Sequence, residues 1–149
     1  MNHSEKAKEL FNSGYNCAQA VFLAFSDLTG MDEKTATMLS SSFGGGMGRL
    51  REVCGAVSGA FMVAGILYGP TDPNDHDAKM KHYARIQALA ARFKEINGSY
   101  ICRELLGLPQ GPSDPEPEKR TEDYYHRRSC GDYVEIAARI LDEYIAENN

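Results

Sequence analysis

Residues 53–68 read VCGAVSGAFMVAGILY, a stretch of the chain that carries no charged side chain. A helix that spans a membrane needs about 20 apolar residues, and this stretch is shorter than that. Gly55 and Gly59 lie four residues apart on the expected helix, so another helix can approach its backbone closely. Gly69 and Pro70 then stop the helix. The stretch therefore predicts a buried helix at the centre of a globular domain.

Cys54 stands at the start of this helix, and Cys17, Cys102 and Cys130 stand at or near the starts of three other predicted helices. The apolar residues that follow each cysteine recur at a spacing of three or four, which places each thiol on the buried side of its helix. The free N–H groups and the dipole of a first helical turn favour the thiolate form. If the four helix starts meet at one end of the bundle, the four thiols meet there as well.

The rest of the chain also follows the helical period, and nothing alternates with period two for long enough to suggest a strand. Ser4, Asn16 and Asp32 are predicted N-caps, Asp75 is predicted to start a long helix, and glycines are predicted to end helices. Helices are predicted over residues 4–11, 17–28, 33–42, 53–68, 75–96, 100–106 and 132–147. We therefore predict one all-α domain over residues 1–149, a bundle of about six or seven helices with the four cysteines near helix N-termini.

Residues 108–123 form the one long segment that is not predicted to be helical. The segment carries four prolines and many charges, a composition that favours a loop or flap. Since the segment leads from the helix of Cys102 to that of Cys130, residues 109–128 are expected to cover the cysteine end of the bundle, and an inert linker is the equal alternative.

Composition and charge exclude some classes of function. The net charge is −5, and 42% of the 149 residues are hydrophobic. No basic face is present to neutralise phosphates, so a nucleic-acid partner is not expected. The first ten residues are polar and charged, unlike a secretory signal, and no membrane span is predicted. The chain is expected to be cytoplasmic, where stable disulfides are uncommon, so its four cysteines favour redox chemistry, metal binding or burial as plain thiols.

A glycine-rich segment, FGGGMGRLREVC, precedes and includes Cys54. Consecutive N–H groups in such a loop can cradle an anion or the sulfide atoms of a cluster. The segment is neither GxGxxG nor followed by GK[ST], so a nucleotide site is disfavoured. Arg49 and Arg51 are candidates to lower the pKa of Cys54 or to compensate an anionic cluster, and plain surface charge is the simpler interpretation. The predicted cofactor-binding residues are Gly44, Gly45, Gly46, Gly48 and Arg49.

Three motifs carry a resemblance to a known family: Gly14-Tyr15-Asn16-Cys17-Ala18-Gln19-Ala20, Gly44-Gly45-Gly46-Met47-Gly48 and Cys54-Gly55-Ala56-Val57-Ser58-Gly59. Together with two further separated cysteines, they resemble the redox-active protein family named for its pattern of Cys, Gly-Cys-Ala-x-x-Gly, Cys, Cys. The resemblance covers about residues 5 to 145. This chain has Cys54-Gly55-Ala56 where the pattern has Gly-Cys-Ala. The resemblance implies a redox role that rests on the cysteines, without specifying a reaction.

Three functions remain open from the sequence. The first is a redox-active protein of the thiol-dependent oxidoreductase kind, with Cys17, Cys54, Cys102 and Cys130 catalytic in thiol–disulfide exchange or electron transfer. Its partner would be a redox protein or a small thiol. The second is a protein that holds an iron–sulfur cluster or a zinc ion with the same four cysteines, although they lack the CxxC spacing of most such sites. The third is a helical interaction protein, a candidate homo-oligomer, with buried structural cysteines.

Overall fold

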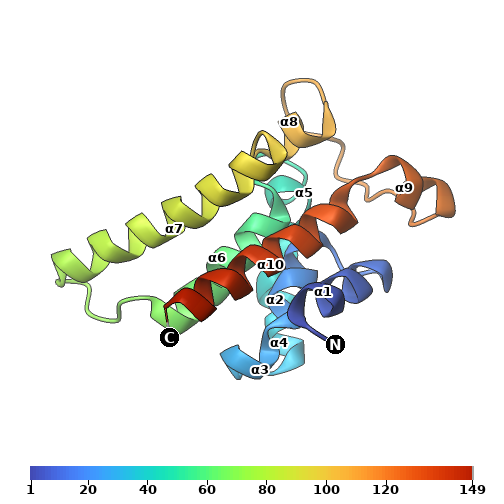
Figure 1. The fold of residues 1–149 in the computed structure, drawn as a ribbon. Coiled ribbons are helices and arrows are strands. Elements are labelled where there is room, and N and C mark those ends of the chain that lie inside the picture. Colours follow the sequence, from blue (N-terminus) through green and yellow to red (C-terminus); the bar gives the residue numbers. More distant parts are fainter. Residues whose placement is uncertain (149) are drawn as a thin grey trace.

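A buried helix, α6 (Gly55–Tyr68), forms the centre of the computed structural model, which describes residues 1–148 (Figure 1). It packs closely on α2 (Cys17–Ala24). A Cβ atom added at Gly59 would lie 2.8 Å from the carbonyl oxygen of Ala18, so the close approach of the two helices requires glycine there. The buried helix and its close packing, both predicted from residues 53–68, are confirmed.

The predicted all-α class is also confirmed. Residues 1–148 contain no β-strand, only an isolated antiparallel bridge between Val53 and Ile101. The remaining helices are α1 (His3–Asn12), α3 (Ser26–Thr29), α4 (Glu33–Ser40), the 3-10 helix η1 (Ser41–Phe43), α5 (Gly44–Met47), α7 (His76–Asn97), α8 (Cys102–Leu106), α9 (Glu122–Arg127) and α10 (Cys130–Glu147).

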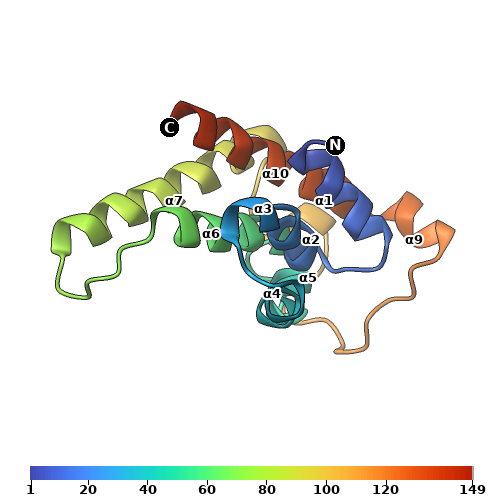
Figure 2. The same ribbon diagram turned by 90° about the horizontal axis from the view of Figure 1, so that it is seen from below.

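The long helices α6, α7 and α10 lie side by side in both views, and α1 packs across α10 (Figures 1 and 2). Their shared core is apolar, and its largest fully buried side chains are Phe22, Phe25, Phe93 and Leu141. The α9 helix stands at the edge of the molecule in both views, at the end of the long connection from α8. No helix within residues 1–148 has both the length and the apolar character needed to cross a membrane.

Local signals set most helix limits correctly. Asn16, Asp32 and Asp75 accept hydrogen bonds from the first turns of α2, α4 and α7, as predicted. The first helix begins earlier than expected, because Asn2 rather than Ser4 is its cap. The last helix begins at Cys130, two residues earlier than expected.

Two helix predictions are wrong. The single helix expected over residues 17–28 is divided, because Phe25 departs from helical geometry (φ −101°, ψ 20°) with its side chain fully buried in the core and stacked on His3. Residues 122 and 123 were expected to be loop but begin α9, whose first turn is capped by the Thr121 side chain.

Candidate functional site

The four cysteines stand at the starts of four different helices. Cys17, Cys102 and Cys130 are the first residues of α2, α8 and α10, and Cys54 is the N-cap of α6. All four thiols are free, and all four line one cavity of about 300 Å³. The four helix starts therefore meet as the sequence suggested, and residues up to 113 positions apart in the chain share one site.

The glycine-rich segment forms part of the cavity wall. Gly44, Gly45, Gly48 and Arg49 line the cavity. Gly46 does not line it but supports it from behind, because a Cβ there would lie 2.7 Å from Cβ of Cys102. The predicted cofactor-binding residues therefore lie at the site or directly against it.

This wall has an unusual backbone. Five consecutive residues, 45–49, have positive φ angles between 61° and 71°, and Arg51 has φ 65°. Left-handed geometry costs roughly 1–2 kcal/mol for each residue that is not glycine, and Met47, Arg49 and Arg51 all bear this cost. Strained backbone of this kind persists where the surrounding structure holds it, often at functional sites.

Backbone N–H groups lie near the sulfur atoms, as expected for thiols at helix starts. The N–H groups of Gly45 and Ala18 act to lower the pKa of the Cys17 thiol. Those of Ala56 and Val57, in the first turn of α6, act in the same direction on the pKa of Cys54. These donors favour a negatively charged sulfur at both positions.

The predicted lowering of the thiol pKa values is nevertheless wrong for three of the four cysteines. Burial raises the pKa of Cys17 and raises that of Cys54 well above its ordinary value, outweighing the effect of the nearby N–H groups. Burial also raises the pKa of Cys130 to about 12, with the neighbouring thiols Cys17 and Cys102 adding to the rise. Without a bound cation, these three thiols are protonated at neutral pH.

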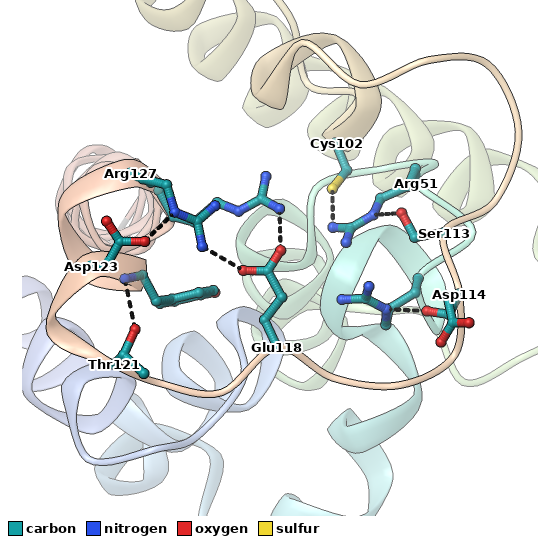
Figure 3. Close-up of polar contacts among 11 residues, drawn as sticks. Arg51, Cys102, Ser113, Asp114, Glu118, Thr121, Asp123 and Arg127 are labelled. Carbon is teal, nitrogen blue, oxygen red and sulfur yellow. Dashed lines mark hydrogen bonds and ion pairs between the residues drawn. The ribbon is translucent and has the colours of Figure 1, made fainter.

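The interpretation of Arg51 as a plain surface charge is also wrong, because the residue is buried. Only 5% of the residue is exposed. Its Nη1 lies 3.5 Å from Cys102 Sγ, and its Nε donates a hydrogen bond of 2.8 Å to Ser113 Oγ. Figure 3 shows Arg51 between these two partners. The sulfur that it contacts is that of Cys102 rather than that of Cys54.

Arg49, Arg120 and Arg128 also line the cavity. Arg128 pairs with Glu118 at 2.6 Å. Arg49 instead donates to the backbone oxygen of Asp114. Arg120 donates to the backbone oxygen of Phe11, near the end of α1, and to that of Tyr15, in the loop that follows. Within residues 1–148, no carboxylate forms an ion pair with Arg49, Arg51 or Arg120. The cavity thus carries excess positive charge and favours an anionic occupant.

The proline-rich segment lies over this cavity. Pro115, Pro117, Glu118 and Arg120 contribute to its lining, and Figure 3 shows the segment passing around the site from Ser113 to Thr121. The sequence did not identify Ser113, Glu118, Arg120 or Arg128 as site residues. Among these residues only Arg128 has a local signal, its position two residues before Cys130.

The cavity that the four thiols share is larger than a single ion. No three His, Cys, Asp or Glu side chains in the described part of the chain converge closely enough to hold a single metal. A zinc ion would need four sulfurs at about 2.3 Å from one point, and the thiols line, together with other residues, a cavity of about 300 Å³. Thiols with N–H groups and arginines around them are donors of the kind that an anionic iron–sulfur cluster takes.

Comparison with known proteins identifies the family. Residues 15–144 match the family described as "Putative redox-active protein (C_GCAxxG_C_C)". The chain belongs to this family, which confirms the resemblance seen in its motifs. It is also 26% identical over 151 aligned residues to an uncharacterized protein of Archaeoglobus fulgidus, with 94% of this chain and 93% of that protein covered. No solved structure matches the chain.

Proposed function

We propose that this redox-active family member is an electron carrier whose Cys17, Cys54, Cys102 and Cys130 hold an iron–sulfur cluster. The convergence of the four thiols on one cavity of about 300 Å³ is the observation that carries the proposal. Such a cluster, when bound, accepts and returns single electrons at a potential set by its charge, hydrogen bonds and exposure.

Each wall of the cavity would have a part in this function. The four sulfurs would serve as ligands, and the N–H groups of Gly45 and Ala56 stabilise negative charge on two of them. Arg51 and Arg120 supply positive charge that no carboxylate of residues 1–148 compensates. Positive charge and N–H donors favour the more negative, reduced state and so raise the reduction potential. The covering proline-rich segment, which lines the cavity with Pro115 and Pro117, would limit the access of water.

The proposal is tested by purifying the protein without oxygen and measuring its iron, acid-labile sulfide and native mass. We expect iron and sulfide in stoichiometric amounts, and we expect serine at any one of the four cysteine positions to abolish or alter the same spectroscopic signal. Ser129→Ala is the matched control, because Ser129 precedes Cys130 and is exposed. Iron-free protein, after purification and after reconstitution with iron and sulfide, would refute the proposal.

Thiol–disulfide exchange between Cys17 and Cys54 is the second candidate. The observation that favours it is the proximity of the two thiols: charge on Cys17 raises the pKa of Cys54, and Cys17 Sγ rests against Gly55. The raised pKa values count against it, since the thiolate is the attacking form. An iron-free chain whose mass falls by about two daltons on oxidation, one disulfide's worth of hydrogen, would favour this function instead.

A further inference from the structure

The covering segment, defined here as residues 108–121, is attached to the site at both ends. It begins after α8, which Cys102 opens, and it leads through α9 to Cys130. Its first half is held by residues of the glycine-rich segment: the Ser113 N–H donates to the Arg49 carbonyl oxygen at 2.9 Å, and Arg51 Nε donates to Ser113 Oγ. Its second half is held by the ion pairs of Glu118 with Arg127 and Arg128.

Among these contacts, Arg51 alone joins the covering segment to a ligand sulfur. One edge of its guanidinium faces Cys102 Sγ and another faces Ser113 Oγ (Figure 3). The group is planar and rigid, so fixing one edge fixes the direction of the other. Its charge is buried and has no carboxylate partner within residues 1–148, so the state of the sulfur decides how well the charge is stabilised.

A neutral thiol is a weak acceptor, whereas a negatively charged sulfur makes a charge-assisted hydrogen bond with a guanidinium. Each thiol that becomes a metal ligand releases its proton. The Cys102 sulfur, when it is a negatively charged ligand, is therefore a strong partner of Arg51, whose Nη1 lies 3.5 Å from it. The stronger bond holds Arg51 in the orientation in which its Nε meets Ser113.

We propose that Arg51 couples negative charge on the sulfur of Cys102 to closure of the covering segment over the cysteine site. Arg51 is thus a positioning residue. The inference rests on the proposed function for the source of that charge, but not for the coupling itself. Because the coupling is reciprocal, a closed covering segment also favours the charged, loaded site, and an empty site leaves the segment freer to open and admit iron and sulfide.

The first test needs no metal. Cys102→Asp places a permanent negative charge beside Arg51, and Cys102→Ser is its neutral counterpart. We expect amide hydrogen exchange in residues 108–121 to be about tenfold slower in C102D than in C102S, the effect of one charge-assisted hydrogen bond. The difference should vanish when each is combined with Arg51→Gln. Equal exchange in C102D and C102S chains that both fold, or a difference that survives R51Q, would overturn the proposal.

The second test uses the chain loaded anaerobically with ferrous iron and sulfide. We expect loading to slow amide hydrogen exchange in residues 108–121 of the wild type by about tenfold. The slowing should be much smaller in R51Q and in Ser113→Ala. Arg92→Gln is the matched control, since Arg92 pairs with Glu147 away from the cavity. Equal slowing in wild type and R51Q overturns the coupling. A wild type that takes up no iron refutes the proposed function. In that case the metal-free comparison of C102D with C102S still tests whether Arg51 couples the sulfur to the covering segment.

Discussion

Gly55 brings α6 against the sulfur of Cys17. A Cβ atom at this position would lie 2.4 Å from Cys17 Sγ and 2.9 Å from the carbonyl oxygen of Phe43. Gly55→Ala should therefore push Cys17 out of place and destabilise the fold by about 1–3 kcal/mol, as overpacking of a filled core does. Urea unfolding of the metal-free protein and iron uptake by the same sample measure the two effects.

The same helix supplies the control for this prediction. An alanine Cβ at Gly65 would meet nothing within 4 Å, and alanine in a helix interior is favoured over glycine by about 0.5–1 kcal/mol. Gly65→Ala should raise stability slightly and leave iron uptake unchanged. If both variants behave alike, the contact between Gly55 and Cys17 does not shape the site.

Cys130 should make the metal-free, reduced protein sensitive to alkali. Burial raises the pKa of this thiol from 9.0 to about 12, so above pH 9 the unfolded chain loses the proton while the folded chain keeps it. Stability due to the neutral thiol is complete below the unfolded pKa and is lost as the pH rises toward the folded one. Free energies of unfolding measured between pH 7 and 10.5 should fall less steeply in Cys130→Ser than in the wild type. Parallel curves would contradict the raised pKa.

At the scale of elements, α2 depends on a capping box that also belongs to the site. Asn16 accepts from the Gln19 N–H, Gln19 bonds back to the Asn16 N–H, and the Asn16 amide donates to the carbonyl oxygen of Ser41. Asn16 lines the cavity beside Cys17. Asn16→Ala should cost about 0.5–2 kcal/mol of stability and should also weaken iron binding, because the start of α2 carries a ligand.

Asp75→Ala is the control that separates a loss of overall stability from a loss of iron binding. Asp75 caps α7 at the end of that helix remote from Cys102, and its side chain accepts from the Ala78 N–H. We expect a comparable loss in the unfolding free energy with no change in the metal titration. A metal affinity that falls equally in both variants would mean that overall stability, rather than the start of α2, controls binding.

The starts of the helices were readable from the sequence because a cap is a local interaction. Asn16, Asp32 and Asp75 each bond to a residue three positions later, and Asn16 places Cys17 at the start of its helix. The helices of Cys54, Cys102 and Cys130 have no side-chain cap, and the spacing of their apolar residues indicated where they begin. The break at Phe25 was not readable, since it arises from burial of the aromatic ring in a core built from distant helices. Tertiary packing overrode a continuous helical pattern there.

At the scale of the whole molecule, loading of the site should stabilise the entire fold. Its ligands come from α2, α6, α8 and α10, so a bound cluster would cross-link four helices that the unfolded chain cannot bring together. With free ligand a hundredfold above Kd, the free energy of unfolding should rise by about 2.7 kcal/mol. Urea denaturation of reconstituted and chelator-treated protein measures the difference, which should be smaller or absent in Cys102→Ser.

The convergence of the thiols could be anticipated from the sequence, but the surroundings of the thiols could not. Arg51 meets Ser113 across 62 positions of the chain, and Arg120 reaches the carbonyl oxygen of Phe11 across 109. No local pattern encodes contacts of that separation. The same limitation explains the wrong sign of the pKa change. The sequence displays the N–H donors of a first helical turn, whereas the burial that outweighs them exists only in the folded molecule.

The packing of α1 against α10 has a consequence for synthesis on the ribosome. The residues of α1 emerge well before those of α10, yet the two helices cover one another's apolar faces. Cys130, the final thiol of the cavity, emerges only with α10. Until then the nascent chain exposes an unfinished core and three thiols without their fourth, so a cluster of the kind proposed could be inserted only after this helix is translated. During that interval the growing chain depends on its cellular surroundings to keep the thiols reduced and the apolar surfaces apart.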